Sequence, residues 1–356
     1  MPDAALAVPA DLLAREAELR ARIGSVRMRD AANALGVPEA ALLEARRSTG
    51  DAVRLARPDG PGGFGAILAR LPEVGEVMAL TRNDACVHEL QGRFAVPEIE
   101  GGMGQVVGEI DLRLFLRHWV IGFALEEETR SGRRRSLQFF DAAGGAIHKI
   151  YATEATDRVA FERIVTDAQD RGATPARFAP VKDAAPERPD AEVDVAGLVA
   201  AWEALAHTHE FFLLLRRFGI GRAQAMRLAG SDRARPLSLD AARTALEEAA
   251  AATLPIMAFV GNPGCVQIHS GPVHRIEKVG PWLNVLDPRF NLHLHTDRVA
   301  TAWAVRKPSV NGEIHSVELY DTAGELACQL FGHRQAGGTE RADWRALVGA
   351  LPSREA

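Results

Sequence analysis

The pattern of hydrophobic and polar residues occurs twice along this chain. Residues 136–152 read "SLQFFDAAGGAIHKIYA" and residues 316–332 read "SVELYDTAGELACQLFG". In both segments apolar and polar residues alternate, an Asp/Gly turn interrupts the alternation, and the alternation resumes. This pattern predicts a β-hairpin at each place, one beginning at Ser136 and the other at Ser316.

Three further pairs of segments lie in the same order at nearly the same spacing, which indicates a duplicated chain. They are residues 36–45 with 219–228, residues 78–94 with 257–273, and residues 110–127 with 290–307. Each half is expected to open with helices, continue with several antiparallel strands and close with a helix, near Phe161 and near Trp344. The predicted fold class is therefore α+β, a tandem duplication of two similar halves, each a mostly antiparallel sheet flanked by helices.

A segment rich in Pro, Ala and charged residues separates the two halves. It reads "GATPARFAPVKDAAPERPDAEVD" from Gly172 and has little apolar periodicity, which is typical of a linker. We expect residues 1–182 to form the first repeat, residues 183–192 to link the repeats, and residues 193–356 to form the second repeat, which carries the ligand cleft.

Composition narrows the class of protein. The chain has 356 residues, 47% of them hydrophobic, and a formal net charge of −5. The negative charge argues against general binding to nucleic acid or to a membrane surface. The three cysteines are Cys86, Cys265 and Cys328, an odd number without metal-ligand spacing that favours reduced thiols in the cytoplasm. No export signal and no membrane-spanning stretch are expected, so we predict a cytoplasmic protein that is not embedded in a membrane.

The two halves differ in charge at aligned positions. Four acidic residues of the first half correspond to basic residues of the second: Glu39 to Arg222, Glu126 to Arg306, Glu127 to Lys307, and Glu154 to Arg334. A cationic site in the second half, suited to carboxylates or phosphates, explains the common direction of these changes. The alternative is that these are solvated surface positions whose charges have drifted.

A histidine is also found in the second half alone. His209 aligns with Val26, and it precedes the apolar run that begins at Phe211. Phe212, Leu213 and Arg216 follow three, four and seven residues later, so we expect them on the same helical face as His209. One imidazole, an apolar wall and nearby cations together suit haem, a large flat apolar molecule with an iron and two carboxylates. The alternative for His209 is a core or capping histidine hydrogen-bonded within the protein.

Longer motifs resemble one protein family. The segments "THEFF", "FVGNPGCVQIHSG", "WLNVLDPRFNLHL", "AWAVRKP", "SVELYD" and "GELACQLFGHR" of the second half are similar to the bacterial cytoplasmic haem-utilisation family, whose members are called haemin-degrading factors or haemin transport proteins. "TRNDACVHE", "DLRLFLRHW", "SLQFFD" and "KIYATE" carry the resemblance through the first half. It covers nearly the whole chain, and it implies haem held in a cleft of the second half.

The resemblance assigns roles to particular residues. It implies that His209 is the iron ligand and that Arg113, from the first half, is a catalytic residue reaching the open face of the iron. The residues implied to surround the haem and its propionates are Arg222, Lys307, Gln329, Phe331 and Arg334. Comparison of the halves independently singles out His209, Arg222, Lys307 and Arg334. Cys328 stands where some family members carry tyrosine, and His88 is a second haem contact in some members.

The resemblance leaves the fate of haem open. Some members are described as haem-degrading enzymes and others as chaperones that pass haem to a separate oxygenase. The implied partners are haem itself and, around it, a haem importer ATPase, a reductase or a haem oxygenase. Two other functions remain: a metalloenzyme built on His207, His209, His293 and His295, and a site for another acidic ligand that uses Arg222, Lys307 and Arg334 without iron.

Overall fold

The computed structural model describes residues 5–57, 63–129, 132–181, 186–335 and 337–354. These residues group into two compact units. The first comprises Met1–Arg82, Glu89–Lys182 and Asn262–Gln267, and the second comprises Asn83–His88, Asp183–Gly261 and Ile268–Ala356. Each half thus contributes one short segment to the other unit. The expected boundaries, with residues 1–182 in the first repeat and residues 193–356 in the second, did not include this exchange of short segments.

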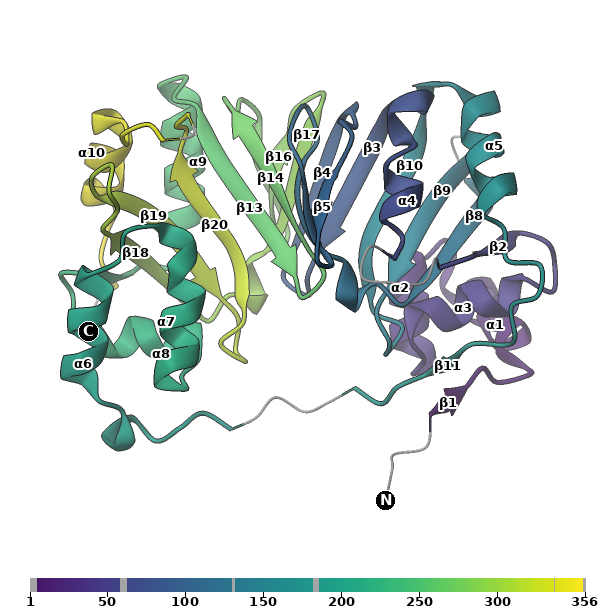
Figure 1. The fold of residues 1–356 in the computed structure, drawn as a ribbon, viewed down its shortest axis with the longest axis horizontal. Coiled ribbons are helices and arrows are strands. Elements are labelled where there is room, and N and C mark those ends of the chain that lie inside the picture. Colours follow the sequence, from purple (N-terminus) through teal and green to yellow (C-terminus); the bar gives the residue numbers. More distant parts are fainter. Residues whose placement is uncertain (1–4, 58–62, 130–131, 182–185, 336, 355–356) are drawn as a thin grey trace. The chain divides into compact units, whose positions relative to one another are not determined.

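The first unit contains an antiparallel run of strands with helices before and after it in the chain (Figure 1). Its strands are ordered β3-β10-β9-β8-β2, and a three-stranded segment is ordered β7-β6-β5. Its elements are β1 (Leu6–Ala7), α1 (Leu12–Ile23), α2 (Met28–Leu35), α3 (Glu39–Arg46), β2 (Ala52–Leu55), α4 (Gly65–Leu68), β3 (Gly75–Arg82), β5 (Glu98–Glu100), β6 (Met103–Val106), β7 (Asp111–Phe115), β8 (Ile121–Thr129), β9 (Gly132–Phe140), β10 (Ala146–Thr156), α5 (Arg158–Ala168) and β11 (Arg177–Phe178).

The second unit repeats this arrangement, with strands ordered β13-β20-β19-β18-β12 and a three-stranded segment ordered β17-β16-β15. Helices α9 and α10 pack against each other and against β19 (Figure 1). Its elements are α6 (Val195–Glu203), α7 (Phe211–Phe218), α8 (Arg222–Leu228), β12 (Ala234–Leu237), α9 (Ala241–Ala251), β13 (Ile256–Asn262), β15 (Ile276–Val279), β16 (Trp282–Leu286), β17 (Phe290–His295), β18 (Thr301–Lys307), β19 (Ile314–Tyr320), β20 (Leu326–Gly332) and α10 (Ala342–Ala350). Strands β4 (Cys86–Arg93) and β14 (Cys265–Gly271) are divided between the units.

The helical openings correspond residue by residue. Helices α2 and α7 have the same length, and α3 and α8 begin after the same interval. Gly36 and Gly219 follow α2 and α7 in the left-handed conformation, with φ of 67° and 64°. Glycine adopts this conformation without the steric penalty of a side chain, so it ends both helices at the same place. The predicted duplication and α+β class are confirmed.

The expected linker is described only in part. Residues 183–185 lie outside the described residues, and residues 190–192 form a short 3₁₀ turn, Asp190–Glu192. The division into repeat, linker and repeat remains a prediction.

An asparagine fixes the turn before β14 in the first unit. The Asn262 side chain donates hydrogen bonds to the carbonyls of Arg82 (2.9 Å) and Ile147 (2.8 Å), and its Oδ1 accepts from the amides of Gly264 and Cys265 (both 3.0 Å). The counterpart in the second unit is Asn83, whose side chain bonds to β20 and to the Cys86 amide. One amide side chain thus satisfies four backbone groups that would otherwise lack partners.

We expect Asn262→Ala to lower the free energy of unfolding by about 2–3 kcal/mol, because it removes four hydrogen bonds and leaves part-buried backbone groups unpaired. Chemical denaturation measures the change. Asn311→Ala is the matched control, since Asn311 is exposed in a turn and is expected to change stability by less than about 0.5 kcal/mol. Equal effects of the two substitutions would contradict this role for Asn262.

Candidate functional site

The predicted iron ligand lies in the turn that precedes α7. Thr208–Glu210 forms a single 3₁₀ turn, and the α-helix begins at Phe211 rather than at His209. The Glu210 carboxylate accepts hydrogen bonds from the amides of Ala206 (3.0 Å) and His207 (3.1 Å), which lowers its pKa. The turn leaves His207 and His209 exposed, with parallel rings 5.2 Å apart. His209 is therefore not a core histidine.

Helix α7 exposes an apolar surface directly after His209. Its inner side buries Phe211, Leu214 and Leu215 in the core of the unit. Its outer side leaves Phe212 and Leu213 with exposed fractions of 55% and 61%. Neighbouring large apolar side chains that face solvent indicate a binding surface more often than isolated ones do.

The equivalent surface of the first unit is polar. Phe212 and Leu213 are the second and third residues of α7, and Arg29 and Asp30 hold the same places in α2. The aligned helices thus bury similar inner faces, but only the second exposes aromatic and aliphatic side chains beside a histidine. This difference assigns the candidate site to the second unit.

Helix α8 begins with the first of the predicted cations. The guanidinium of Arg222 lies over the ring of Phe211, 5.1 Å from its centroid, and the side chain is 26% exposed. Its Nη1 is 3.3 Å from Oε2 of Glu318 on β19. Burial disfavours the charged guanidinium, but the Glu318 carboxylate outweighs burial and raises the pKa of Arg222. Arg222 is thus a fixed cation that still faces solvent.

Lys307 occupies a deeper position. Its ammonium lies 4.6 Å from the centroid of the Phe211 ring, pairs with Glu318, and belongs to a side chain that is only 4% exposed. Burial lowers the pKa of Lys307, with Arg222 adding to the effect, and Glu318 partly offsets it. The Lys307 ammonium is thus largely shielded from solvent and paired with a buried carboxylate.

The sheet brings several predicted residues to one face. Ser316 and Phe331 are paired across β19 and β20, and so are Glu318 and Gln329. Directly opposed residues of antiparallel strands point to the same side. Phe331 also packs edge-to-face against Phe259 of β13, with ring centroids 5.1 Å apart, and sequence reasoning missed this aromatic.

Arg334 follows β20 and is half-buried. Burial lowers its pKa, and Glu340 opposes that shift. Its Nε is buried and has no hydrogen-bond partner among the described residues. The guanidinium is thus a candidate donor for a ligand.

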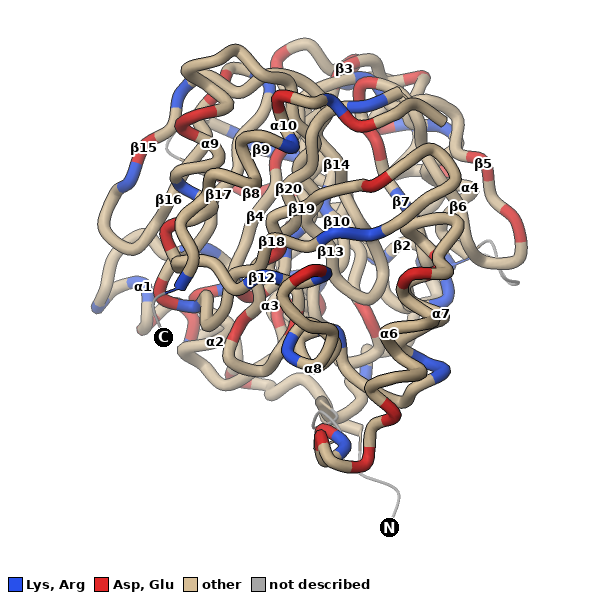
Figure 2. Tube along the Cα trace, turned by 90° about the vertical axis from the view of Figure 1, so that its left-hand side faces the viewer, with Lys and Arg blue, Asp and Glu red and all other residues tan. Residues whose placement is uncertain are grey.

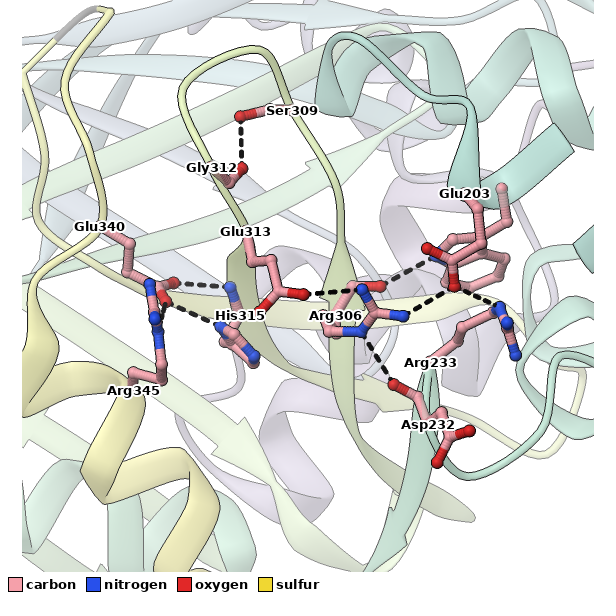
Figure 3. A network of polar contacts seen from close by, with 11 residues as sticks. Glu203, Asp232, Arg233, Arg306, Ser309, Gly312, Glu313, His315, Glu340 and Arg345 are labelled. Carbon is pink, nitrogen blue, oxygen red and sulfur yellow. Dashed lines mark hydrogen bonds and ion pairs between the residues drawn. The ribbon is translucent and has the colours of Figure 1, made fainter. Parts of the chain in front are cut away.

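At one of the four acidic-to-basic differences, the basic residue takes part in a network of ion pairs. Arg306 donates hydrogen bonds to Glu203 (2.7 Å), Glu313 (2.8 Å) and the carbonyl of Asp232 (3.0 Å), as Figure 3 shows. These contacts use its guanidinium in a surface network. Arg306, which the family resemblance does not place in the haem site, thus has carboxylate partners within the second unit.

The multi-histidine metalloenzyme is not supported. Among the described residues, no group of three or more His, Cys, Asp or Glu side chains is arranged to hold a metal ion. His293 instead bonds through Nδ1 to the Asn284 side chain at 2.7 Å, and His295 packs against Trp282. The alternating histidines thus belong to local contacts of β17.

Comparison with known protein families shows to which family the chain belongs. A family model described as the haemin-degrading HemS/ChuX domain matches the chain twice, over residues 36–168 and 219–351. The chain belongs to this family. The two matches begin at Gly36 and Gly219, the glycines that end helices α2 and α7.

Members and solved structures of the haemin-degrading HemS/ChuX family resemble the whole chain. The hemin transport protein HemS of Yersinia enterocolitica is 38% identical over 92% of this chain and 93% of its own length. Holo-PhuS, a heme-binding protein from Pseudomonas aeruginosa, is 44% identical with a TM-score of 0.91, covering 97% of this chain and 99% of that one. ChuS, an E. coli heme oxygenase, is 36% identical with a TM-score of 0.86, covering 96% and 99%.

Three further residues singled out by the family resemblance, Arg113, Cys328 and His88, lie on strands and not on the exposed surface of α7. Arg113 is on β7 in the first unit, where it pairs with Asp111 and donates to the carbonyl of Leu112 (3.1 Å). Cys328 is buried on β20, and its thiol helps to raise the pKa of the buried Cys86 thiol, after the larger effect of burial. His88 is buried, with its ring 4.9 Å from Phe290. Among these three side chains, only Arg113 is substantially exposed.

Among the helices in the described part of this HemS/ChuX-family chain, none combines the length and the apolar character needed to cross a membrane. In the view of Figure 2, basic and acidic residues are interspersed along the chain rather than gathered into regions of one sign.

Proposed function

We propose that this chain binds haem in its second unit, with His209 as the iron ligand. The observation that carries the proposal is the exposed imidazole of His209 beside the exposed side chains of Phe212 and Leu213, an arrangement that α2, the counterpart of α7 in the first unit, does not have. A neutral imidazole is a common ligand of haem iron. An apolar surface next to it suits a porphyrin face, since pockets for such ligands are mostly apolar with few polar groups.

The cations are proposed to fix the orientation of the ring. Arg222 is open to solvent and presents N–H donors to a propionate, a geometry for which guanidinium is well suited. Lys307 adds a buried positive charge next to Glu318, the carboxylate that also pairs with Arg222. Arg334 supplies a second hydrogen-bond donor for a propionate. Gln329 and Phe331 line the same side of the sheet as Glu318. The names of the relatives, which refer to haemin transport, heme binding and a heme oxygenase, support this assignment.

The cellular role follows as part of the proposal. The protein receives imported haem in the cytoplasm and either degrades it to release iron or passes it to a haem oxygenase. A haem importer ATPase would deliver the ligand, and a reductase would supply electrons. Bound haem provides the redox chemistry when oxygen and a reductant are present. Arg113 is proposed as a catalytic cation.

Replacing both exposed apolar residues tests the site. We expect Phe212→Ser with Leu213→Ser to weaken haemin binding at least about tenfold, because the variant no longer covers the porphyrin with apolar area. Absorption titration measures the affinity. The thermal stability of the ligand-free protein should change little, since both side chains face solvent. Val159→Ser with Val279→Ser removes two other exposed apolar residues as a control. Unchanged haemin affinity in the double serine variant would contradict the proposed surface.

Degradation is distinguished from transfer by a second measurement. With oxygen and ascorbate, and with catalase present to remove free peroxide, we expect the Soret band of the complex to disappear and iron to become chelatable. Arg113→Ala should slow this loss about tenfold or more while leaving haemin affinity unchanged. A complex that keeps its Soret band under these conditions would identify the protein as a carrier of intact haem.

A further inference from the structure

A buried carboxylate lies behind the cations of the proposed haem site. The Glu318 side chain is fully buried and accepts from four groups. Oε1 accepts from Lys307 and from the Ser316 hydroxyl at 3.0 Å, and Oε2 accepts from the Tyr320 hydroxyl and from Arg222. These contacts overcome the effect of burial and lower the pKa of Glu318, so the side chain is an anion at neutral pH.

The four partners differ in their access to a ligand. Lys307, Ser316 and Tyr320 are buried, whereas Arg222 remains 26% exposed and has the longest contact with Glu318, at 3.3 Å. Arg222 is therefore the member that is able to serve two anions, Glu318 from inside and a ligand carboxylate from outside. Two cations and one anion leave the cluster with one net positive charge for the ligand.

The first unit shows that the fold does not require this carboxylate. The counterpart of Glu318 is Gln138, which is also buried and which bonds to Ser136, the counterpart of Ser316. The counterpart of Tyr320 is the buried Phe140. The second unit thus has a carboxylate and a phenol at positions where an amide and a phenyl ring complete the same hairpin.

We propose that Glu318 is the resident counter-ion of the haem site and competes with the ligand's carboxylate for Arg222. This inference rests on the proposed function. In the ligand-free protein Glu318 holds Arg222 in place and neutralises part of the positive charge. When a propionate binds, the two carboxylates share Arg222, and their repulsion weakens the complex. Glu318 acts through Arg222, so it is a positioning residue that keeps the affinity low enough for haem to be released.

The test compares haemin with haemin dimethyl ester, which keeps the iron and the ring but has no carboxylate. We expect Glu318→Gln to increase the preference for haemin over the ester about tenfold, the effect of removing one carboxylate charge near a partly desolvated ligand charge. Tyr320→Phe should have the opposite sign. It removes a donor from Glu318, so the carboxylate attracts Arg222 more strongly, and the preference for haemin should fall about threefold.

The opposite signs separate this role from a structural one. A purely structural contribution would weaken haemin and the ester equally in both variants and leave the preference unchanged, which would overturn the inference. Glu318→Gln and Tyr320→Phe each introduce the residue of the first unit, and Tyr320→Phe decides the question if the other variant fails to fold. If the unaltered protein binds neither compound, the proposed function itself is wrong. If it binds both and neither variant changes the preference, only the role of Glu318 is wrong.

Discussion

Lowering the pH from 6.5 to 4.5 is expected to destabilise this protein by about 2–3 kcal/mol through one residue, His148. The imidazole of His148 is fully buried on β10 in the first unit. Its Nδ1 lies 2.8 Å from the Thr81 hydroxyl and 4.0 Å from the thiol of Cys265, and its Nε2 has no hydrogen-bond partner among the described residues. The rings of Trp119 and Phe94 enclose it. Burial lowers the pKa of His148 to about 3.

The direction of this change in stability follows from the protonation of His148 in the folded and the unfolded states. In the unfolded chain His148 takes up a proton near pH 6.5, whereas in the folded protein it stays neutral down to about pH 3. Below pH 6.5 the unfolded state therefore binds more protons, and stability falls by about 1.4 kcal/mol per pH unit. The contribution is fully present above pH 6.5 and is lost as the pH falls toward 3.

Comparison with a non-titrating variant isolates this effect. His148→Gln keeps an acceptor for the Thr81 hydroxyl but carries no ionisable group. Its free energy of unfolding should be lower at pH 7, and it should fall less steeply between pH 6.5 and 4.5, by about 1.4 kcal/mol per pH unit. Urea denaturation at several pH values measures both. His274→Gln, at an exposed histidine, should retain the steep dependence. Equal slopes in all three proteins would show that His148 does not carry the acid sensitivity.

The second large effect is expected at His209. His209→Ala should weaken haemin binding about a hundredfold, or about 2.7 kcal/mol, because the iron loses its only proposed protein ligand while the apolar and cationic contacts remain. The Soret band should shift as water replaces imidazole on the iron. His274→Ala is the control, because His274 is an exposed histidine elsewhere in the second unit and should leave the spectrum unchanged. Unaltered affinity and spectrum in the His209 variant would remove this residue from the iron.

Much of the fold was predictable because the repeat is visible in the residues themselves. The paired hairpins and the paired helices recur in the same order at a nearly constant spacing, and local alternation defines their strands. The exchanged segments 83–88 and 262–267 were not predictable in this way. Both segments contain a similar Asn turn and similar apolar residues. Their sequences therefore do not indicate to which of the two units each segment belongs.

The candidate site was predictable where a residue differs from its counterpart in an obvious way, as His209 differs from Val26 and Arg222 from Glu39. Glu318 was missed, since comparison of acidic with basic positions overlooks a carboxylate that replaces an amide. A signal existed in the replacement of Gln138 by Glu318 within aligned hairpins. The burial of Lys307 was equally hidden, because a lysine at a strand end usually lies in solvent.

Chemical rescue tests iron ligation by His209 most directly. Haemin would be titrated into His209→Gly with and without free imidazole, and the absorption spectra compared with that of the unaltered protein. We predict an altered Soret band in the variant and recovery of the original spectrum when imidazole occupies the position of the missing side chain. A variant that gives the original spectrum without imidazole would contradict the assignment of His209 as the iron ligand.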